Sequence, residues 1–504
     1  MASVDRPSAD ASDSHTHNTS WSAERAPISI SEPCAPLLSP TLVSSPSPRA
    51  FSFRQFFIRT WRSWLFAPLR FLLRPVARLW NMLAGPMLAY AEDVPGNRIG
   101  PDDAPWPLPY QLLEEKDIWN ELRQLAKPQS ATLESAGGLR ADSVNFQPAP
   151  SARTQDRYAV KQLRVHGRTW TLTGVFDGHL GDATVDHVAH HLPIIVQEFL
   201  EEAHATNPAR LNDPAFICDL FSRSIVAFDD AIAHDVLDIF GGIEGLEHYD
   251  DATIRAIIND QHEGGERYRK TLLCMYGSTA LVSLVDPNHE NLWVANLGDC
   301  TATILYKSEN NQWVVERLTA EHNGYNDAEL ERIRREHPDE PDCVIDRRIL
   351  GALAPTRCLG DVPFKQPPVF SRRILYNLAP GFQNRGPWEA FLQRNRTPPY
   401  ITAQPDVVHR KLDSRARFLV LTSDGFTDLC GEQGIEPVLR RWAADVEDGR
   451  RTLPPDAPRV AENLALRLLR QAIGGEDRGS VSRVLTLDID GAWIDDTSIV
   501  VLRF

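Results

Sequence analysis

The stretch Gly174-Val-Phe-Asp-Gly-His-Leu-Gly-Asp182 is the most informative part of this chain of 504 residues, because an apolar run ends directly in an aspartate followed by glycines. The run Thr169 to Phe176 predicts a β-strand, and Gly178 predicts a tight turn after it. A carboxylate at such a strand end is held rigidly, so Asp177 and the carbonyl oxygen of Gly178 can reach one Mg²⁺ or Mn²⁺ ion. For this stretch alone, an ordinary Asp-Gly turn is the alternative.

Aspartates at the ends of other predicted strands repeat the pattern. Asp424 follows the apolar run 418–422, Asp495 and Asp496 open the last apolar run 498–502, and Asp299 lies in a turn between the runs 292–295 and 301–306. Carboxylates gathered at one edge of a sheet repel one another unless cations neutralise them. The pattern therefore favours a metal site over scattered turns.

Helical periodicity separates these strands. After Gly181, the residues Val185, Val188, Ala189 and Leu192 have the spacing of one helix face, and Asn326 resembles a helix start. The polar segment from about 200 to 270 is helical in period and is interpreted as an insertion between core strands. The sequence therefore predicts an α+β fold.

Composition excludes several classes of protein. A formal net charge of -15 argues against a general nucleic-acid binder. The seven cysteines lie far apart without a C-x-x-C pair, which indicates free thiols and a reducing compartment.

The order of the motifs resembles the type 2C metal-dependent protein phosphatase family, from about residue 130 to 504. The DGH-G element at 177–181 is followed by a glycine-serine-threonine strand at 277–280, ANxGD at 295–299, LTxxH at 318–322, RxxGD at 357–361 and SDG at 423–425. The resemblance implies an α/β/β/α sandwich of two central antiparallel sheets flanked by helices. It also implies two Mg²⁺ or Mn²⁺ ions, with positions for a third, and hydrolysis of phosphoserine or phosphothreonine by attack of a metal-bridging water.

The resemblance also implies a role for each matching residue. Asp177 corresponds to the carboxylate that bridges both ions, and His179 to the general acid that protonates the leaving oxygen. The remaining metal ligands would be Asp156, the Gly178 carbonyl, Asp424 and Asp495, with Asp299 and Asp428 at the third ion.

The chain departs from the family pattern at two places. Gln155 stands before Asp156 where the family has glutamate, and an amide cannot supply the missing negative charge. Arg153 and Arg157 lie near the expected phosphate-binding arginine but at other offsets. They are interpreted equally as phosphate ligands or as solvated loop charges. These departures motivate the alternative of a catalytically weakened, regulatory binding protein.

His187 and His191 have the i, i+4 spacing of a zinc site, but no third ligand is evident, so we expect them to be surface histidines.

The N-terminal part differs from the rest. Residues 1–50 are Ser- and Pro-rich and predicted disordered, 51–91 predict an Arg-rich amphipathic segment, and 92–129 predict a linker before the phosphatase domain at 130–504. The Arg-rich segment predicts mitochondrial targeting, with membrane-surface attachment and a simple linker as alternatives. The segment 397–407 and the insertion before it resemble the mitochondrial pyruvate dehydrogenase phosphatase branch. That branch implies a phosphoprotein partner, a dehydrogenase subunit in the matrix.

Overall fold

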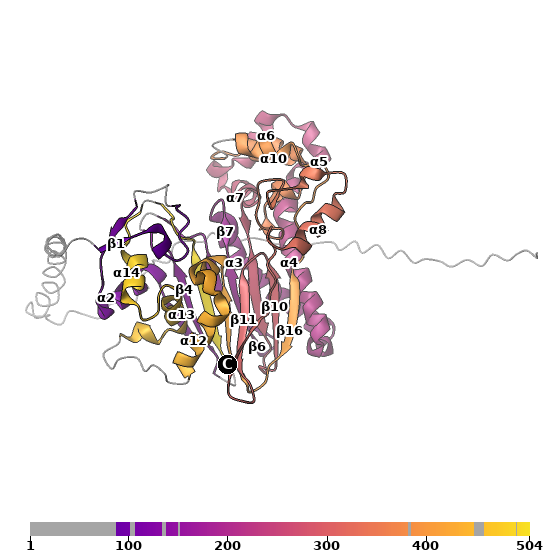
Figure 1. The fold of residues 1–504 in the computed structure, drawn as a ribbon. Coiled ribbons are helices and arrows are strands. Elements are labelled where there is room, and N and C mark those ends of the chain that lie inside the picture. The colour runs from indigo at the N-terminus through magenta and orange to yellow at the C-terminus, as the bar shows by residue number, and fades with distance from the viewer. Residues whose placement is uncertain are drawn as a thin grey trace, which may run out of the picture. The chain divides into compact units, whose positions relative to one another are not determined.

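The computed structural model describes residues 87–100, 106–133, 138–149, 152–381, 385–447, 458–489 and 491–504 (Figure 1). All of them belong to one unit that spans Trp80–Phe504. The predicted tail 1–50 and most of the Arg-rich segment 51–91 lie outside the described residues. Within the described ranges, no helix is long and apolar enough to cross a lipid bilayer.

Two antiparallel sheets form the centre of the unit. The first has the order β16 (Asp406–Lys411), β10 (Asn291–Leu297), β9 (Ala280–Val285), β6 (Arg168–Phe176) and β5 (Arg157–Val165). The second has the order β12 (Trp313–Arg317), β11 (Thr301–Lys307), β17 (Ala416–Thr422), β18 (Thr497–Arg503), β4 (Arg140–Phe146) and β3 (Gln129–Thr132).

Alternating side chains on each central strand serve two different cores. On β9, Leu281 and Val285 lie in the core between the sheets, whereas Val282 and Leu284 lie in the core beneath the helices of the first sheet. Strand β17 alternates in the same way between the inter-sheet core and the helices of the second sheet. Because side chains of a strand alternate between its faces, strands that are apolar throughout are buried on both sides.

Helices cover the outer face of each sheet (Figure 1). On the first sheet lie α3 (Ala183–Thr206), α4 (Pro214–Leu237) and α7 (Glu266–Leu273). On the second lie α2 (Glu115–Ala126), α11 (Asp424–Cys430), α12 (Ile435–Glu447) and α13 (Leu464–Ala472), and α14 (Arg478–Thr486) packs against α2. The predicted α/β/β/α sandwich is therefore confirmed.

The predicted helical insertion is present between β7 and β8, where α5 (Gly242–Gly245) and α6 (Asp251–Ile258) join α4 and α7. The helix start predicted at Asn326 is also confirmed, because its side chain accepts a hydrogen bond from the amide of Ala328 and caps α8 (Asp327–Glu336). Helix α8 contributes to a separate core with α10 (Gly386–Leu392), and α9 (Pro368–Arg373) precedes α10 along the chain.

The described parts of the segment predicted as a linker, 92–100 and 106–129, are instead part of the folded unit. Strand β2 (Leu108–Tyr110) pairs with β1 (Met87–Ala89), and Ile118, Trp119 and Leu122 of α2 are buried in the core of the second sheet. The polar residues between these apolar positions concealed an amphipathic helix.

Short strand pairs complete the unit. The pair β13 (Val344–Ile345) and β14 (Arg348–Ile349) forms a hairpin. Strands β15 (Leu359–Gly360), β8 (Gly277–Ser278) and β7 (Gly178–His179) form a small antiparallel sheet. This small sheet fixes the turn that follows β6.

Candidate active site

Asp177 lies between β6 and β7, in a turn held from both sides. Its amide donates to the Thr279 hydroxyl at 3.0 Å, and the Thr279 amide donates back to the Asp177 carbonyl at 2.9 Å. A Cβ atom at Gly178 would lie 2.6 Å from a methyl carbon of Val185 and 2.8 Å from the Gln155 carbonyl oxygen, so this close approach requires glycine. The turn thus fixes the Asp177 carboxylate.

Carboxylates from both sheets meet at this turn. One oxygen each of Asp177, Asp299 and Asp424 lies within 4.8 Å of the others. Asp299 comes from the turn between β10 and β11, and Asp424 begins α11 directly after β17. Asp156, buried before β5, and Asp495, before β18, interact electrostatically with the same carboxylates. We call Asp156, Asp177, Asp299, Asp424, Asp428 and Asp495 the acidic centre.

The described residues do not fully compensate the negative charge of the acidic centre. Burial, followed by repulsion from neighbouring carboxylates, raises the pKa of Asp156 and Asp177 well above the usual range. Burial and Asp424 raise the pKa of Asp299 and Asp495 to about 7. Within the described residues, Asp156 Oδ2 and Asp424 Oδ1 are buried without a hydrogen-bond partner. Oxygen donors in this condition fit hard divalent cations such as Mg²⁺ or Mn²⁺.

Asp496, the neighbour of Asp495, has a different role. Its Oδ1 accepts a hydrogen bond from the Gln147 side chain at 2.8 Å, and its Oδ2 accepts one from the backbone amide of Gln155 at 2.6 Å. Asp496 therefore holds the backbone beside Asp156, and it also lines the hollow that contains Asp177. Gln155 itself lines the hollow that contains Asp177 and His179.

Arg98, which the sequence analysis did not identify, reaches the acidic centre from the segment before β2. Its Nη2 pairs closely with Asp495 Oδ2 and lies 3.2 Å from Asp428 Oδ2. No motif marks this arginine in the sequence, because its partners lie more than 300 positions later in the chain.

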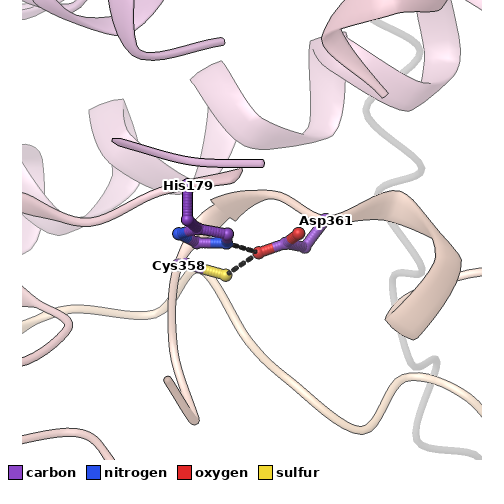
Figure 2. A group of neighbouring side chains, drawn as sticks. All are labelled: His179, Cys358 and Asp361. Atoms are coloured by element: carbon purple, nitrogen blue, oxygen red, sulfur yellow. Dashed lines mark hydrogen bonds and ion pairs between the residues drawn. The ribbon is translucent and has the colours of Figure 1, made fainter. Parts of the chain in front are cut away.

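His179 pairs with Asp361 at the edge of the same hollow (Figure 2). Its Nε2 lies 2.6 Å from Asp361 Oδ2, which also accepts from the Cys358 thiol at 3.0 Å. Burial lowers the pKa of His179, but the charge of Asp361 and its hydrogen bond outweigh burial, so the net shift is upward. A Cβ atom at Gly277 would lie 2.2 Å from His179 Nε2 and 2.1 Å from Asp361 Oδ2, so only glycine leaves room for this pair.

Two other motifs have supporting roles in the structure. His322 of the LTxxH element accepts from the Gly298 amide at 3.2 Å and bonds Asp406 at 3.0 Å, which holds the turn that carries Asp299. Arg357 of the RxxGD element pairs with the buried carboxylate of Glu329 at 2.6 Å. These residues support the acidic centre from outside it.

Arg153 and Arg157 lie beside the start of α3. Arg153 pairs with Asp182 at 3.1 Å, and Arg157 pairs with Asp186 at 2.6 Å. Neither arginine lines the two hollows at the acidic centre. Their role as phosphate ligands stays a prediction.

His187 and His191 contact each other, with ring centroids 4.3 Å apart. Burial lowers the pKa of His187 to about 4, and His187 also contacts the ring of Phe228. Within the described residues, neither histidine belongs to a group of three side chains that could hold a metal. His187 is half-buried rather than a surface residue.

Two adjoining hollows open onto the acidic centre, and Arg98, Asp299, Arg348, Ala354 and Asp424 line both. One hollow continues along apolar side chains that include Leu353, Phe364 and Trp388. Leu180 lies at its rim as a residue that is 58% exposed, and its φ of 66° is left-handed. The arrangement is a cleft in which a bound group meets carboxylates, an imidazole and a guanidinium together.

Carboxylates gathered at one edge of two stacked antiparallel sheets are suited to hold divalent cations of the kind that activate water in metal-dependent hydrolases. The model of the family "Protein phosphatase 2C" matches residues 155–476. The chain belongs to the protein phosphatase 2C family, a family of metal-dependent serine/threonine protein phosphatases.

Individual relatives resemble the chain at moderate identity. It is 32% identical over 257 residues to the mitochondrial pyruvate dehydrogenase (acetyl-transferring) phosphatase 2 of Homo sapiens, a match that covers 45% of this chain and 48% of that relative. It is 27% identical over 418 residues to phosphatase 1 of Rattus norvegicus, covering 71% of this chain and 76% of that relative. A crystal structure of serine-threonine phosphatase 2C from Toxoplasma gondii matches with a TM-score of 0.44 and 15% identity, covering 75% of this chain and 99% of that one.

Proposed function

We propose that this chain hydrolyses phosphoserine and phosphothreonine in proteins, in a reaction that depends on Mg²⁺ or Mn²⁺. The observation that carries the proposal is the convergence of Asp177, Asp299 and Asp424 within 4.8 Å, in a hollow that His179 also lines. Family membership gives the reaction class. These positions support a cation site and an acid-base group in one cleft as parts of the proposal.

We assign two ions to Asp156, Asp177, the Gly178 carbonyl, Asp424 and Asp495, and a third to Asp299 and Asp428. Bound divalent cations would stabilise charge on the phosphoryl oxygens and acidify a water molecule. The unpartnered oxygens of Asp156 and Asp424 and the raised pKa values support this assignment.

His179 is assigned the general acid that protonates the leaving seryl or threonyl oxygen. Because Nε2 is bonded to Asp361, and no described residue bonds Nδ1, Nδ1 is the ring nitrogen left for a substrate oxygen. Asp361 orients the ring and stabilises its charged form, and so acts as a positioning residue.

The second candidate is a regulatory binding protein of weakened activity. Gln155 favours it, because the amide contributes no charge beside Asp156, and metal affinity depends on the groups around the ligands. Restoring the carboxylate by Gln155→Glu is expected to tighten Mn²⁺ binding about tenfold.

The test measures hydrolysis of a phosphoserine peptide by the purified chain, with Mn²⁺, after EDTA, and after Mn²⁺ is restored. We expect activity that EDTA abolishes and Mn²⁺ recovers, with Gln155→Glu active at lower Mn²⁺ concentration. A chain that binds Mn²⁺ but turns over no phosphopeptide, with either residue at position 155, would favour the binding protein.

The relatives named as pyruvate dehydrogenase phosphatases lead us to propose a mitochondrial dehydrogenase subunit as the phosphoprotein substrate. The Arg-rich segment 51–91 supports targeting to the mitochondrial matrix or to a membrane surface there. A reporter fused to residues 49–91 is expected to enter mitochondria. A cytosolic reporter would contradict the localisation and leave the phosphatase activity unaffected.

A further inference from the structure

Arg98 is held in place by its backbone as well as by its side chain. Its amide donates to the carbonyl of Trp493 at 2.9 Å, two residues before Asp495. The Asn97 side chain donates to Ala91 and Ile99 carbonyls at 3.2 and 2.9 Å, which closes the turn on both sides of Arg98.

The segment that carries Arg98 is also anchored by packing. Ala89 and Val94 are buried in the same core as Ile494 and Leu429, which flank the acidic centre in sequence. The position of the guanidinium is therefore specified by the fold.

The contacts of the guanidinium leave part of it available. Both carboxylate contacts, to Asp428 and Asp495, are made by Nη2. Within the described residues, Nη1 and Nε donate no hydrogen bond. The side chain is 49% exposed and lines both hollows of the cleft.

A phosphoryl group carries two negative charges near neutral pH, so it is repelled by a cleft lined with aspartates. The cleft needs positive charge in addition to the cations that the carboxylates hold. Arg153 and Arg157 are engaged with Asp182 and Asp186. Arg348 lines both hollows but donates to the Ala352 carbonyl in its own loop. Of these four arginines, Arg98 is the one in contact with the acidic centre.

We propose that Arg98 binds the phosphoryl group of the substrate, with Nη2 anchored to Asp428 and Asp495 while Nη1 or Nε donates to a phosphoryl oxygen. Both parallel donor pairs of a guanidinium include Nη2, so the contact with phosphate is a single charge-assisted hydrogen bond together with the attraction between the charges. The proposal rests on the phosphatase function proposed above. It places a substrate ligand outside the family match, which begins at residue 155.

The test compares Arg98→Gln and Arg98→Lys with wild type and with Arg415→Gln. The last variant is a control at an exposed turn, where Arg415 forms an ion pair with Asp413 and with no other described residue. On the full chain saturated with Mn²⁺, binding of inorganic phosphate is measured by calorimetry, and KM and kcat are measured for a phosphoserine peptide. Mn²⁺ affinity and the melting temperature are measured in parallel.

We expect Arg98→Gln to weaken phosphate binding and raise KM at least tenfold, while Mn²⁺ affinity is unchanged or tighter. Arg98→Lys should recover part of the loss, because it restores the charge but cannot bind the two carboxylates and the phosphoryl group through separate planar donors. Arg415→Gln should behave as wild type.

Phosphate binding and KM within twofold of wild type in Arg98→Gln would overturn the proposal, because Arg98 would then be only a counter-ion for Asp495. Weakened phosphate binding in Arg348→Gln but not in Arg98→Gln would also overturn it. If wild type hydrolyses no phosphopeptide, the proposed function fails, yet phosphate binding to the Mn²⁺-loaded chain still decides the role of Arg98.

Discussion

The carboxylate of Glu329 and those of the acidic centre are both buried, and the protein treats them in opposite ways. Glu329 in α8 accepts hydrogen bonds from Arg357 at 2.6 and 3.0 Å, from Arg332 at 3.0 Å and from Thr356 at 2.8 Å. Burial raises the pKa of Glu329, but these bonds outweigh it and hold the pKa far below the usual range. In the acidic centre, burial and repulsion raise the pKa of Asp177.

This contrast shows that the fold can stabilise a buried, charged carboxylate where it supplies hydrogen-bond donors. The donors around Glu329 are arginines and a threonine, whereas Asp177 faces Asp156, Asp299 and Asp424. Strand ends that gather only acids are expected to stabilise a different partner, a divalent cation. The predictions that follow test this contrast.

The largest effect is expected from Asp177→Asn, which removes the central carboxylate. Activity on a phosphoserine peptide should fall about a thousandfold or more, because residues of a catalytic unit act together. In EDTA the variant should melt at a higher temperature than wild type, because a neutral amide removes the repulsion. A lower melting temperature in EDTA would show that Asp177 is already neutralised within the protein.

Glu329→Gln should have the opposite effect on stability. Removing the Glu329 charge leaves Arg357 paired with Asp406 alone, and we expect a loss of about 3 kcal/mol in the free energy of unfolding. Urea denaturation measures it, with Asp413→Asn on an exposed turn as the control that leaves the midpoint unchanged. If Glu329→Gln leaves the free energy of unfolding unchanged, the contrast between the two regions would be removed.

The ion pair between Glu329 and Arg357 should also affect how stability depends on pH. Because the folded pKa of Glu329 lies below its unfolded value of about 4.3, its contribution is present above that pH and is lost as pH falls toward the folded pKa. Wild type should lose stability more steeply than Glu329→Gln below about pH 4. The free energy of unfolding of both proteins is measured by urea denaturation across this pH range. An equal loss in the two proteins would contradict the lowered pKa of Glu329.

The smallest effect is expected at Leu180, at the rim of the cleft. A leucine with φ of 66° is strained, and asparagine tolerates this conformation better. Leu180→Asn should stabilise the protein by about 1 kcal/mol, measured by urea denaturation. A destabilised variant would indicate that Leu180 contributes to packing despite its 58% exposure.

The sequence predicted the central strands because apolar runs ending in aspartate carry a local signal. Strands predicted at 169–176 and 301–306 are observed as Arg168–Phe176 and Thr301–Lys307. Strand β16 was missed because Asp406, His409, Arg410 and Lys411 make its sequence polar, as suits a sheet edge.

The acidic residues of the site could be predicted for the same local reason, but their partners could not. Asp361 was recognised only as part of a motif, and its pairing with His179 depends on a small sheet built from three distant segments. Arg98 carries no local signal at all, because only the folded chain brings it to Asp495.

Strand β18 has a consequence for the synthesis of the protein. It lies between β17 and β4, so the second sheet joins residues near 140 to residues near 500. Until residue 503 has been synthesised, β4 and β17 each lack this neighbour and leave backbone donors and acceptors unpaired. Because such distant pairing slows folding, a nascent chain would pass through a long period in which chaperones protect these open edges.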